Sequence, residues 1–344
     1  MNRRMFVDSA RKKMEVLIEG TLSVRKDFRP PHAFSTSRSG PDAGHRSLVL
    51  EFEGHRLKVP VVRGGESTFA LEEKGNSHIV LKNATPFIGE VSIIPCDFHA
   101  PAQAFINLEG GCRFDCAFCS LGGKKGTASL EPEKASEMIL NAWSKGEIES
   151  AAITSGVMSS SSETAEKMAE VVKRVRKDAS LPLGVEPYLE DIAQVQELHS
   201  AGADEMKINI HSWNREIFRK ICPGWDFDRT LEMVEEACAV FGKGNVSSNI
   251  LFGLGESDQD IVGGIEHLAS LGCAAVLRKT RVTEDNRRRL LGAVGQIQSV
   301  SPERWLALAM RQKEIFERYG MDPGTQKTMC HPCGCCDIVP FKDI

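Results

Sequence analysis

The sequence of 344 residues lacks any long apolar run and any excess of positive charge. Its first twenty residues carry charges and no apolar stretch of the length that a secretory signal needs. No later segment approaches the roughly 20 apolar residues of a membrane span. Lys and Arg number 43 against 47 Asp and Glu, so the net charge of −4 creates no basic field for nucleic acid. We therefore expect a cytoplasmic protein that binds neither membranes nor nucleic acid.

The first part of the sequence, residues 1–101, lacks long amphipathic helices after an initial helical pattern over Asp8 to Ile18. The segment SLVLEFEGHRLKVPVV alternates apolar and polar residues on both sides of Gly54, which predicts a hairpin. HIVLKN and GEVSIIP are typical of further strands. We interpret residues 1–101 as an accessory region that is mostly β.

From residue 102 to residue 282 the pattern changes to strands that alternate with helices of 12 or more residues. This alternation is typical of βα units around a parallel sheet. Six predicted strands can be counted, namely AFINLEG, SAAITSG, PLGVEP, EMKINI, SSNILFGL and AAVLRKTRV. The sequence therefore predicts an α/β fold with a partial (β/α)6 TIM-type barrel. Residues 283–344 hold one more predicted helix, Pro302 to Tyr319, and a Cys-rich tail.

Seven of the eleven cysteines fall in two tight groups, a pattern that favours metal chemistry over disulfides in a reducing compartment. The first group is Cys112, Cys116 and Cys119, directly after the first barrel strand, where barrel active sites are built. Four thiolates normally complete an iron–sulfur cubane, so three leave one iron open to an outside ligand. The alternative is a zinc site or three buried thiols, but the loop offers no fourth ligand for structural zinc.

The C-x3-C-x2-C spacing, with Phe118 before the last cysteine, resembles the hallmark of the radical S-adenosylmethionine (SAM) superfamily. The resemblance implies a [4Fe-4S] cluster on the three cysteines and SAM bound to the open iron. It also implies a low-potential electron donor, whose electron cleaves SAM into methionine and a 5′-deoxyadenosyl radical. The protein would supply position and exclude water while cofactor and cluster carry the chemistry.

Further cofactor contacts are expected where the next barrel strands end. Ser155 and Gly156 follow the second strand, where the family has a Gly-rich turn that meets the amino group of SAM. Glu186 ends the third strand and resembles the family's ribose contact, since a carboxylate accepts from both hydroxyls. Asn209 is expected on the lumen side of the fourth strand, which it shares with Lys207 and His211. The alternative for each of these residues is an ordinary polar side chain at the end of a strand, without a role in cofactor binding.

The second cysteine group lies in the tail and contains Cys330, Cys333, Cys335 and Cys336, flanked by Pro and Gly. We predict an auxiliary [4Fe-4S] cluster here; zinc and a redox-active tail are the alternatives. His331 is a further candidate ligand, and Cys96 a distant one. The remaining cysteines are interpreted as small buried hydrophobic residues, Cys222, Cys238 and Cys273.

Within the superfamily, the sequence resembles the biotin and lipoyl synthase branch over about Gln103 to Tyr319. The resemblance rests on three segments, namely Gly253-Leu-Gly-Glu256, the turn Arg219-x3-Pro223-Gly224 and the last predicted helix. The sequence lacks the N-terminal C-x4-C-x5-C motif of single-chain lipoyl synthases and is more similar to one subunit of the two-protein type.

This resemblance implies a lipoyl synthase-type sulfurtransferase of lipoate biosynthesis. It would insert sulfur at C6 or C8 of an octanoyl chain on a lipoyl carrier protein, with a second radical SAM subunit as partner. A biotin synthase-like mutase or cofactor-biosynthesis enzyme is the alternative, and an iron–sulfur carrier or scaffold is an alternative of another class. Scattered lumen side chains specify the substrate, so fold alone does not fix it.

Overall fold

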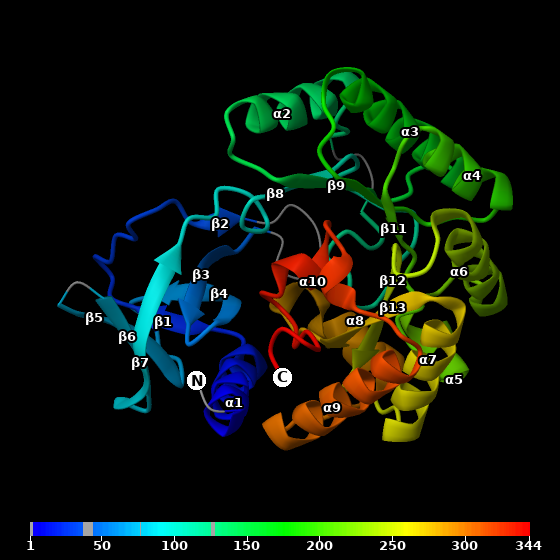
Figure 1. Ribbon diagram of the computed structural model, residues 1–344. Helices are drawn as coiled ribbons and strands as arrows, with labels where there is room; N and C mark the ends of the chain where they lie inside the picture. Colours follow the sequence, from blue (N-terminus) through cyan, green and yellow to red (C-terminus); the bar gives the residue numbers. More distant parts are fainter. Residues whose placement is uncertain (1–2, 37–43, 76, 125–127) are drawn as a thin grey trace.

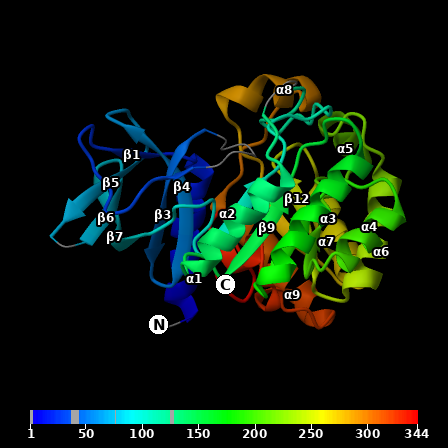
Figure 2. The same ribbon diagram turned by 90° about the horizontal axis from the view of Figure 1, so that it is seen from above.

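The computed structural model describes residues 3–36, 44–75, 77–124 and 128–344 (Figure 1). The N-terminal strands form one sheet and the later strands form a second, parallel sheet with helices on its outer face. Figure 2 shows the two sheets side by side. No helix in the described ranges combines the length and apolar character needed to span a membrane.

The N-terminal sheet has seven strands in the order β2-β3-β4-β1-β5-β6-β7. An additional pairing of β3 with β7 closes the sheet on itself. The predicted hairpin is formed by β3 and β4, and Gly54 adopts φ +84° at its turn. Helix α1 (Arg3–Glu19) packs beside β4 and begins five residues before the predicted start. The strands are β1 (Leu22–Val24), β2 (Ser35–Thr36), β3 (Arg46–Phe52), β4 (His55–Arg63), β5 (Phe69–Lys74), β6 (Ser77–Lys82) and β7 (Thr85–Ile94).

The second sheet contains the six predicted barrel strands, all parallel and in sequence order from β8 to β13. They are β8 (Gln103–Asn107), β9 (Ser150–Thr154), β10 (Leu183–Glu186), β11 (Glu205–Lys207), β12 (Val246–Phe252) and β13 (Cys273–Lys279). Every residue of β12 is buried, as expected for a parallel strand covered on both faces. The sheet stays open with β8 and β13 at its edges, so the predicted partial barrel is confirmed.

Helices cover the outer face of this sheet (Figure 1). They are α2 (Pro132–Ser144), α3 (Ser161–Asp178), α4 (Ile192–Ser200), α5 (Arg215–Ile221), α6 (Phe227–Phe241), α7 (Asp258–Leu271) and α9 (Pro302–Arg318). Helix α8 (Glu284–Val294) packs against α5 and lies apart from this layer (Figure 2). Helix α4 begins three residues later than predicted because Asp191 and Gln194 form a capping box at its start. Helix α8 was not predicted.

The Cys-rich tail lies between the N-terminal sheet and the barrel (Figure 1). It contains the 3₁₀ turn η1 (Pro323–Thr325) and the short helix α10 (Cys330–Cys333). Lys13 of α1 and Asp343 form an ion pair at 2.8 Å, and both side chains are at most 1% exposed. His55 of β4 approaches the other oxygen of Asp343 at 2.9 Å. The tail is therefore fixed to the N-terminal region by buried polar contacts.

Candidate functional site

The first cysteine group lies on the loop that follows β8. The amide of Cys112 donates to the carbonyl of Lys124 at 3.1 Å, and Cys112 also forms a bridge with Gly122, so the loop closes on itself. The amide of Cys119 donates to the carbonyl of Cys116 at 3.1 Å. All three cysteines line one cavity of about 810 Å³ between the barrel and the N-terminal region. This volume lies within the usual range of ligand sites.

The surroundings of these thiols suit thiolates that bind iron. Backbone amides donate to two of the sulfurs, Val157 to Cys112 at 3.3 Å and Leu121 to Cys119 at 3.4 Å. Burial raises the pKa of Cys119 to about 11 and also raises the pKa of Cys112. Thiolates at this buried site need a bound cation to neutralise them, because burial disfavours the charged form of the thiol.

Within the described ranges, no group of three or more His, Cys, Asp or Glu side chains converges on the position of a single metal ion. A tetrahedral zinc site would require such convergence. A cubane does not, because each thiolate binds its own iron at a separate corner. The arrangement of Cys112, Cys116 and Cys119 around one cavity therefore suits a [4Fe-4S] cluster better than zinc.

A fourth thiol lies near this loop, which the sequence did not indicate. Burial and the contact with Cys116 raise the pKa of Cys222 well above its usual range. Cys222 is fully buried at the end of α5, and it is absent from the cavity wall that holds the three motif cysteines. The amide of Ala117 donates to the carbonyl of Ile221 at 2.8 Å, which fixes the loop to α5. Cys222 thus lies behind the loop, consistent with a small buried hydrophobic residue.

Helix α8 holds the loop from the other side. Arg289 donates to the carbonyl of Cys116 at 2.9 Å and to the carbonyl of Cys119. Asn286, which is fully buried, donates to the carbonyl of Phe118 at 3.0 Å. The sequence did not indicate either residue. The run Asn286-Arg-Arg-Arg289 is polar, and its local pattern does not show which side chain contacts the cysteine loop.

Phe118 of the cysteine loop lines the same cavity, and so do the predicted strand-end residues Ser155, Gly156, Glu186, Lys207, Asn209 and His211. Asn209 donates to Glu186 at 2.7 Å and accepts from the amide of Asn249 at 3.0 Å, so its orientation is fixed. A Cβ on Gly156 would lie 2.0 Å from the carbonyl oxygen of Gly111, so only glycine fits between β9 and the cluster loop. The structure thus brings together every strand-end residue that the sequence indicated.

Several polar atoms on the cavity wall are buried and have no hydrogen-bond partner among the described residues. They include Asn107 Oδ1, His211 Nδ1, Asn249 Oδ1 and Thr280 Oγ1. Burial, with a smaller effect of Lys207, lowers the pKa of His211 to about 3, so its ring is neutral at physiological pH. Its ring centroid lies 4.4 Å from that of Phe118. Because buried polar groups are normally paired, these atoms fit a polar ligand such as SAM.

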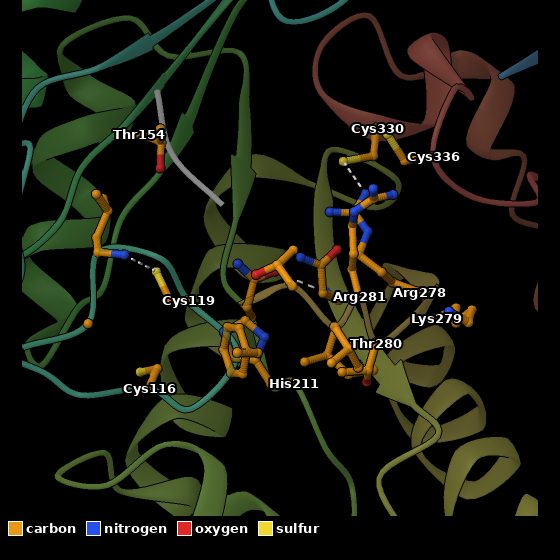
Figure 3. A pocket seen from close by; sticks show the side chains of 18 of the residues that line it. Cys116, Cys119, Thr154, His211, Arg278, Lys279, Thr280, Arg281, Cys330 and Cys336 are labelled. Atoms are coloured by element: carbon orange, nitrogen blue, oxygen red, sulfur yellow. Dashed lines mark hydrogen bonds between the residues drawn. The ribbon is translucent and has the colours of Figure 1, made fainter. Parts of the chain in front are cut away.

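The second cysteine group opens into the same cavity. Cys330 and Cys336 line it at the end opposite Cys116 and Cys119 (Figure 3). A small adjoining cavity is lined by all four tail cysteines. Two cations donate to the sulfur of Cys330, the buried Lys207 at 3.1 Å and the partly buried Arg278 at 3.2 Å.

One candidate ligand of the tail points elsewhere. His331 is buried, its Nδ1 lies 2.6 Å from Oε1 of Gln326, and it lines neither of the two cavities. Its suggested role as an alternative ligand is therefore not supported by its position. Cys96 also lines neither cavity, but it is buried in one cluster with Cys335, against which Cys333 and Cys336 pack.

Comparisons with known proteins agree with this geometry. Residues 106–268 match the family model of the radical SAM superfamily. A lipoyl synthase of Oleidesulfovibrio alaskensis is 25% identical over 227 residues, 64% of this chain and 74% of that protein. A protein described as probable GTP 3′,8-cyclase of Saccharolobus solfataricus is 27% identical over 135 residues, 39% of this chain and 43% of that one. The crystal structure of methylornithine synthase matches with a TM-score of 0.52 at 18% identity over 62% of each chain, a likeness of fold alone.

The matched segment runs from β8 into α7 and includes the three-cysteine loop. Residues 106–268 form a radical SAM domain, which supports a radical SAM enzyme. The superfamily resemblance of the sequence is thus confirmed for this domain. A domain of this family implies a [4Fe-4S] cluster and SAM as cofactors.

Proposed function

We propose that this radical SAM enzyme is a sulfurtransferase of the lipoyl synthase type, which inserts sulfur into a protein-bound octanoyl chain. One observation carries the proposal: two cysteine groups from distant parts of the chain line opposite ends of one cavity. A carbon radical must meet sulfur before it meets another hydrogen donor, so the sulfur source has to face the same space as the radical source. The likeness to a lipoyl synthase supports this reading.

In this proposal Cys112, Cys116 and Cys119 hold the first cluster. When bound there with SAM, the cluster supplies a 5′-deoxyadenosyl radical. Glu186, fixed by Asn209, would accept hydrogen bonds from the ribose hydroxyls. The main chain beside Ser155 and Gly156 would meet the amino group of the cofactor. His211 would offer a neutral ring nitrogen to the ligand.

The remainder of the wall suits an acyl chain. The residues of α1, β4 and β12 on this wall include apolar side chains: Leu17, Ile18, Val61, Val62 and Leu251. They belong largely to the N-terminal region, whereas the polar strand ends belong to the barrel. An octanoyl chain lying along the apolar side would have its carbons between the first cysteine group and the tail thiols.

The partners follow from this chemistry. A low-potential donor would reduce the first cluster, a lipoyl carrier protein would present the octanoyl-lysine, and a second radical SAM subunit would share the two insertions. The tail cysteines would hold the auxiliary [4Fe-4S] cluster that provides sulfide.

The likeness to the probable GTP 3′,8-cyclase favours a second candidate, a radical SAM enzyme of cofactor biosynthesis that transfers no sulfur. The biotin synthase-like mutase belongs to the same class of alternative. An iron–sulfur carrier without turnover is the candidate of another class.

One experiment separates these functions. The anaerobically reconstituted protein is incubated with SAM, dithionite and an octanoyl-lysine peptide, and the products are analysed by mass spectrometry. We expect 5′-deoxyadenosine together with a thiolated peptide. Deoxyadenosine without thiolation, even with a second radical SAM subunit added, would favour the cofactor-biosynthesis enzyme, and absence of deoxyadenosine would favour the carrier.

A further inference from the structure

The segment that follows β7 contains a further cysteine beside the tail thiols. This residue is Cys96, which is 4% exposed. Cys96, Cys335 and Val49 of β3 form a separate small cluster of buried residues, and Cys333 and Cys336 pack against it. All these cysteines are free thiols. Five thiols from two distant segments therefore gather at one place, counting Cys330 on the cavity side.

We propose that Cys96 is a ligand of the auxiliary iron–sulfur cluster, so that the N-terminal region and the tail hold this cluster jointly. The inference rests on the proposed function only in requiring that the second cluster exists. A cubane accepts four protein thiolates, so the tail need not supply all of them. The adjacent Cys335 and Cys336 are then not both required, because Cys96 provides a thiol from the opposite side.

The main chain holds this arrangement in place. The amide of Lys58 in β4 donates to the carbonyl of Cys335 at 2.8 Å. The ammonium group of the same Lys58 donates to the carbonyl of His99 at 2.7 Å, three residues after Cys96. One buried residue of β4 thus fixes both the tail and the segment that carries Cys96.

A second set of contacts orders the far end of the tail. Lys13 of α1 donates to the carbonyl of Gly334 at 2.6 Å and to Asp343 at 2.8 Å, entirely out of solvent. Lys342 donates to the carbonyl of Pro332 at 2.7 Å. The loop between Cys333 and Cys335 is therefore positioned by the protein itself, as a preformed cluster site requires.

The charges around the thiols fit an anionic cluster. Lys207 and Lys58 are buried cations beside the tail, and Arg278 is a partly buried one. Burying a cation is unfavourable unless an anion lies near it. Arg278 is paired with Asp337, and both Arg278 and Lys207 donate to the sulfur of Cys330. Four thiolates on a [4Fe-4S] core carry net negative charge, which these cations would balance.

The test uses the full chain after anaerobic reconstitution, with iron and sulfide quantitation and EPR of the reduced protein. The wild type should bind about eight irons, as two cubanes require. The Cys96→Ala variant should bind about four and lose one EPR signal, while the remaining signal still changes on addition of SAM. The matched control is Cys238→Ala, since Cys238 is buried against Cys273 and lies outside the cluster of Cys96 and the tail thiols, and it should keep both clusters.

Retention of about eight irons and an unchanged EPR spectrum in Cys96→Ala would overturn the ligand assignment and leave the proposed function intact. About four irons in the wild type, or zinc in the tail, would overturn both. If Cys96→Ala does not fold, Cys96→Ser replaces the sulfur with an oxygen donor of similar size. A shifted EPR signal of the second cluster then supports ligation, and an unshifted signal contradicts it.

Discussion

Four thiols lie close together near the first cysteine loop, and their positions assign them different roles. Cys112, Cys116 and Cys119 line the cavity, whereas Cys222 lies behind Cys116 and is fully buried. The sequence motif identified the three because their spacing is local. It could not place Cys222, which approaches Cys116 only because α5 packs on the loop.

We therefore predict opposite outcomes for two alanine variants. Cys119→Ala should lose the first cluster and form no 5′-deoxyadenosine. Cys222→Ala should keep the cluster and its SAM cleavage, at a loss of about 1 kcal/mol in the free energy of unfolding for a small cavity. Iron quantitation and deoxyadenosine assays check both. An iron-free Cys222→Ala variant would mean that Cys222 binds the cluster and that no iron is left open for SAM.

His211 predicts a pH dependence of stability. Burial lowers the pKa of His211 to about 3 from 6.5, so between these values the unfolded chain binds the extra proton. This contribution to stability is present above about pH 6.5 and is lost as the pH falls. By pH 5 the iron-free chain should lose about 2 kcal/mol of unfolding free energy through this residue.

The matched variant is His211→Asn, because asparagine tolerates the φ of +58° at this position. Urea unfolding at pH 7.5 and pH 5 is compared between the variant and the wild type. The difference between the two pH values should be smaller in His211→Asn by about the same 2 kcal/mol. An equal difference in both proteins would contradict a neutral, buried His211.

Among the helices, α8 holds the cluster loop by hydrogen bonds that Asn286 and Arg289 donate to loop carbonyls. The strands and most helices of the barrel were predictable, because their apolar periodicity and their capping residues depend only on neighbouring residues in the sequence. Helix α8 was not, because only Asn286 and Leu290 of its residues are buried and its pattern is largely polar. Its role depends on hydrogen bonds to a loop that lies far away in the sequence.

Arg289→Ala should loosen the loop without unfolding the barrel. Arg289 is partly exposed, so we expect a loss of about 1 kcal/mol in stability and a cluster that a chelator removes several times faster. Arg288→Ala is the control, since Arg288 is exposed on the same helix. The decay of cluster absorbance under anaerobic EDTA measures the effect. Equal decay in the two variants would show that α8 does not hold the loop.

At the scale of the whole molecule, the N-terminal region, the barrel and the tail meet around one cavity. The sequence predicted each of the three segments, because each has its own periodicity or composition. It did not predict that Lys13, His55 and Asp343 join the two ends of the chain. Such a contact depends on tertiary packing and has no local signal.

The buried pair between Lys13 and Asp343 should be essential to this arrangement. Burial tends to raise the pKa of Asp343, but Lys13 and His55 hold it below its usual value, so the carboxylate is charged. Asp343→Asn leaves the ammonium group of Lys13 without a charged partner and should cost about 3 kcal/mol. Limited proteolysis should then cut the tail faster.

The control is Asp27→Asn, which breaks the exposed pair of Arg25 and Asp27 and should change stability by less than about 1 kcal/mol. Denaturant unfolding of both variants gives the comparison. Similar small losses in the two would mean that the tail is held by other contacts.

In the proposed function, the auxiliary cluster on the tail cysteines supplies sulfur to the cavity in which the radical forms. The most direct measurement reconstitutes the protein with heavy-isotope sulfide and follows the label into an octanoyl-lysine peptide by mass spectrometry, with SAM, dithionite and a second radical SAM subunit present. We expect the thiolated product to carry the heavy isotope, and Cys330→Ala to form deoxyadenosine but no thiolated product. A product without the label, or thiolation that persists in Cys330→Ala, would rule out the tail cluster as the source of sulfur.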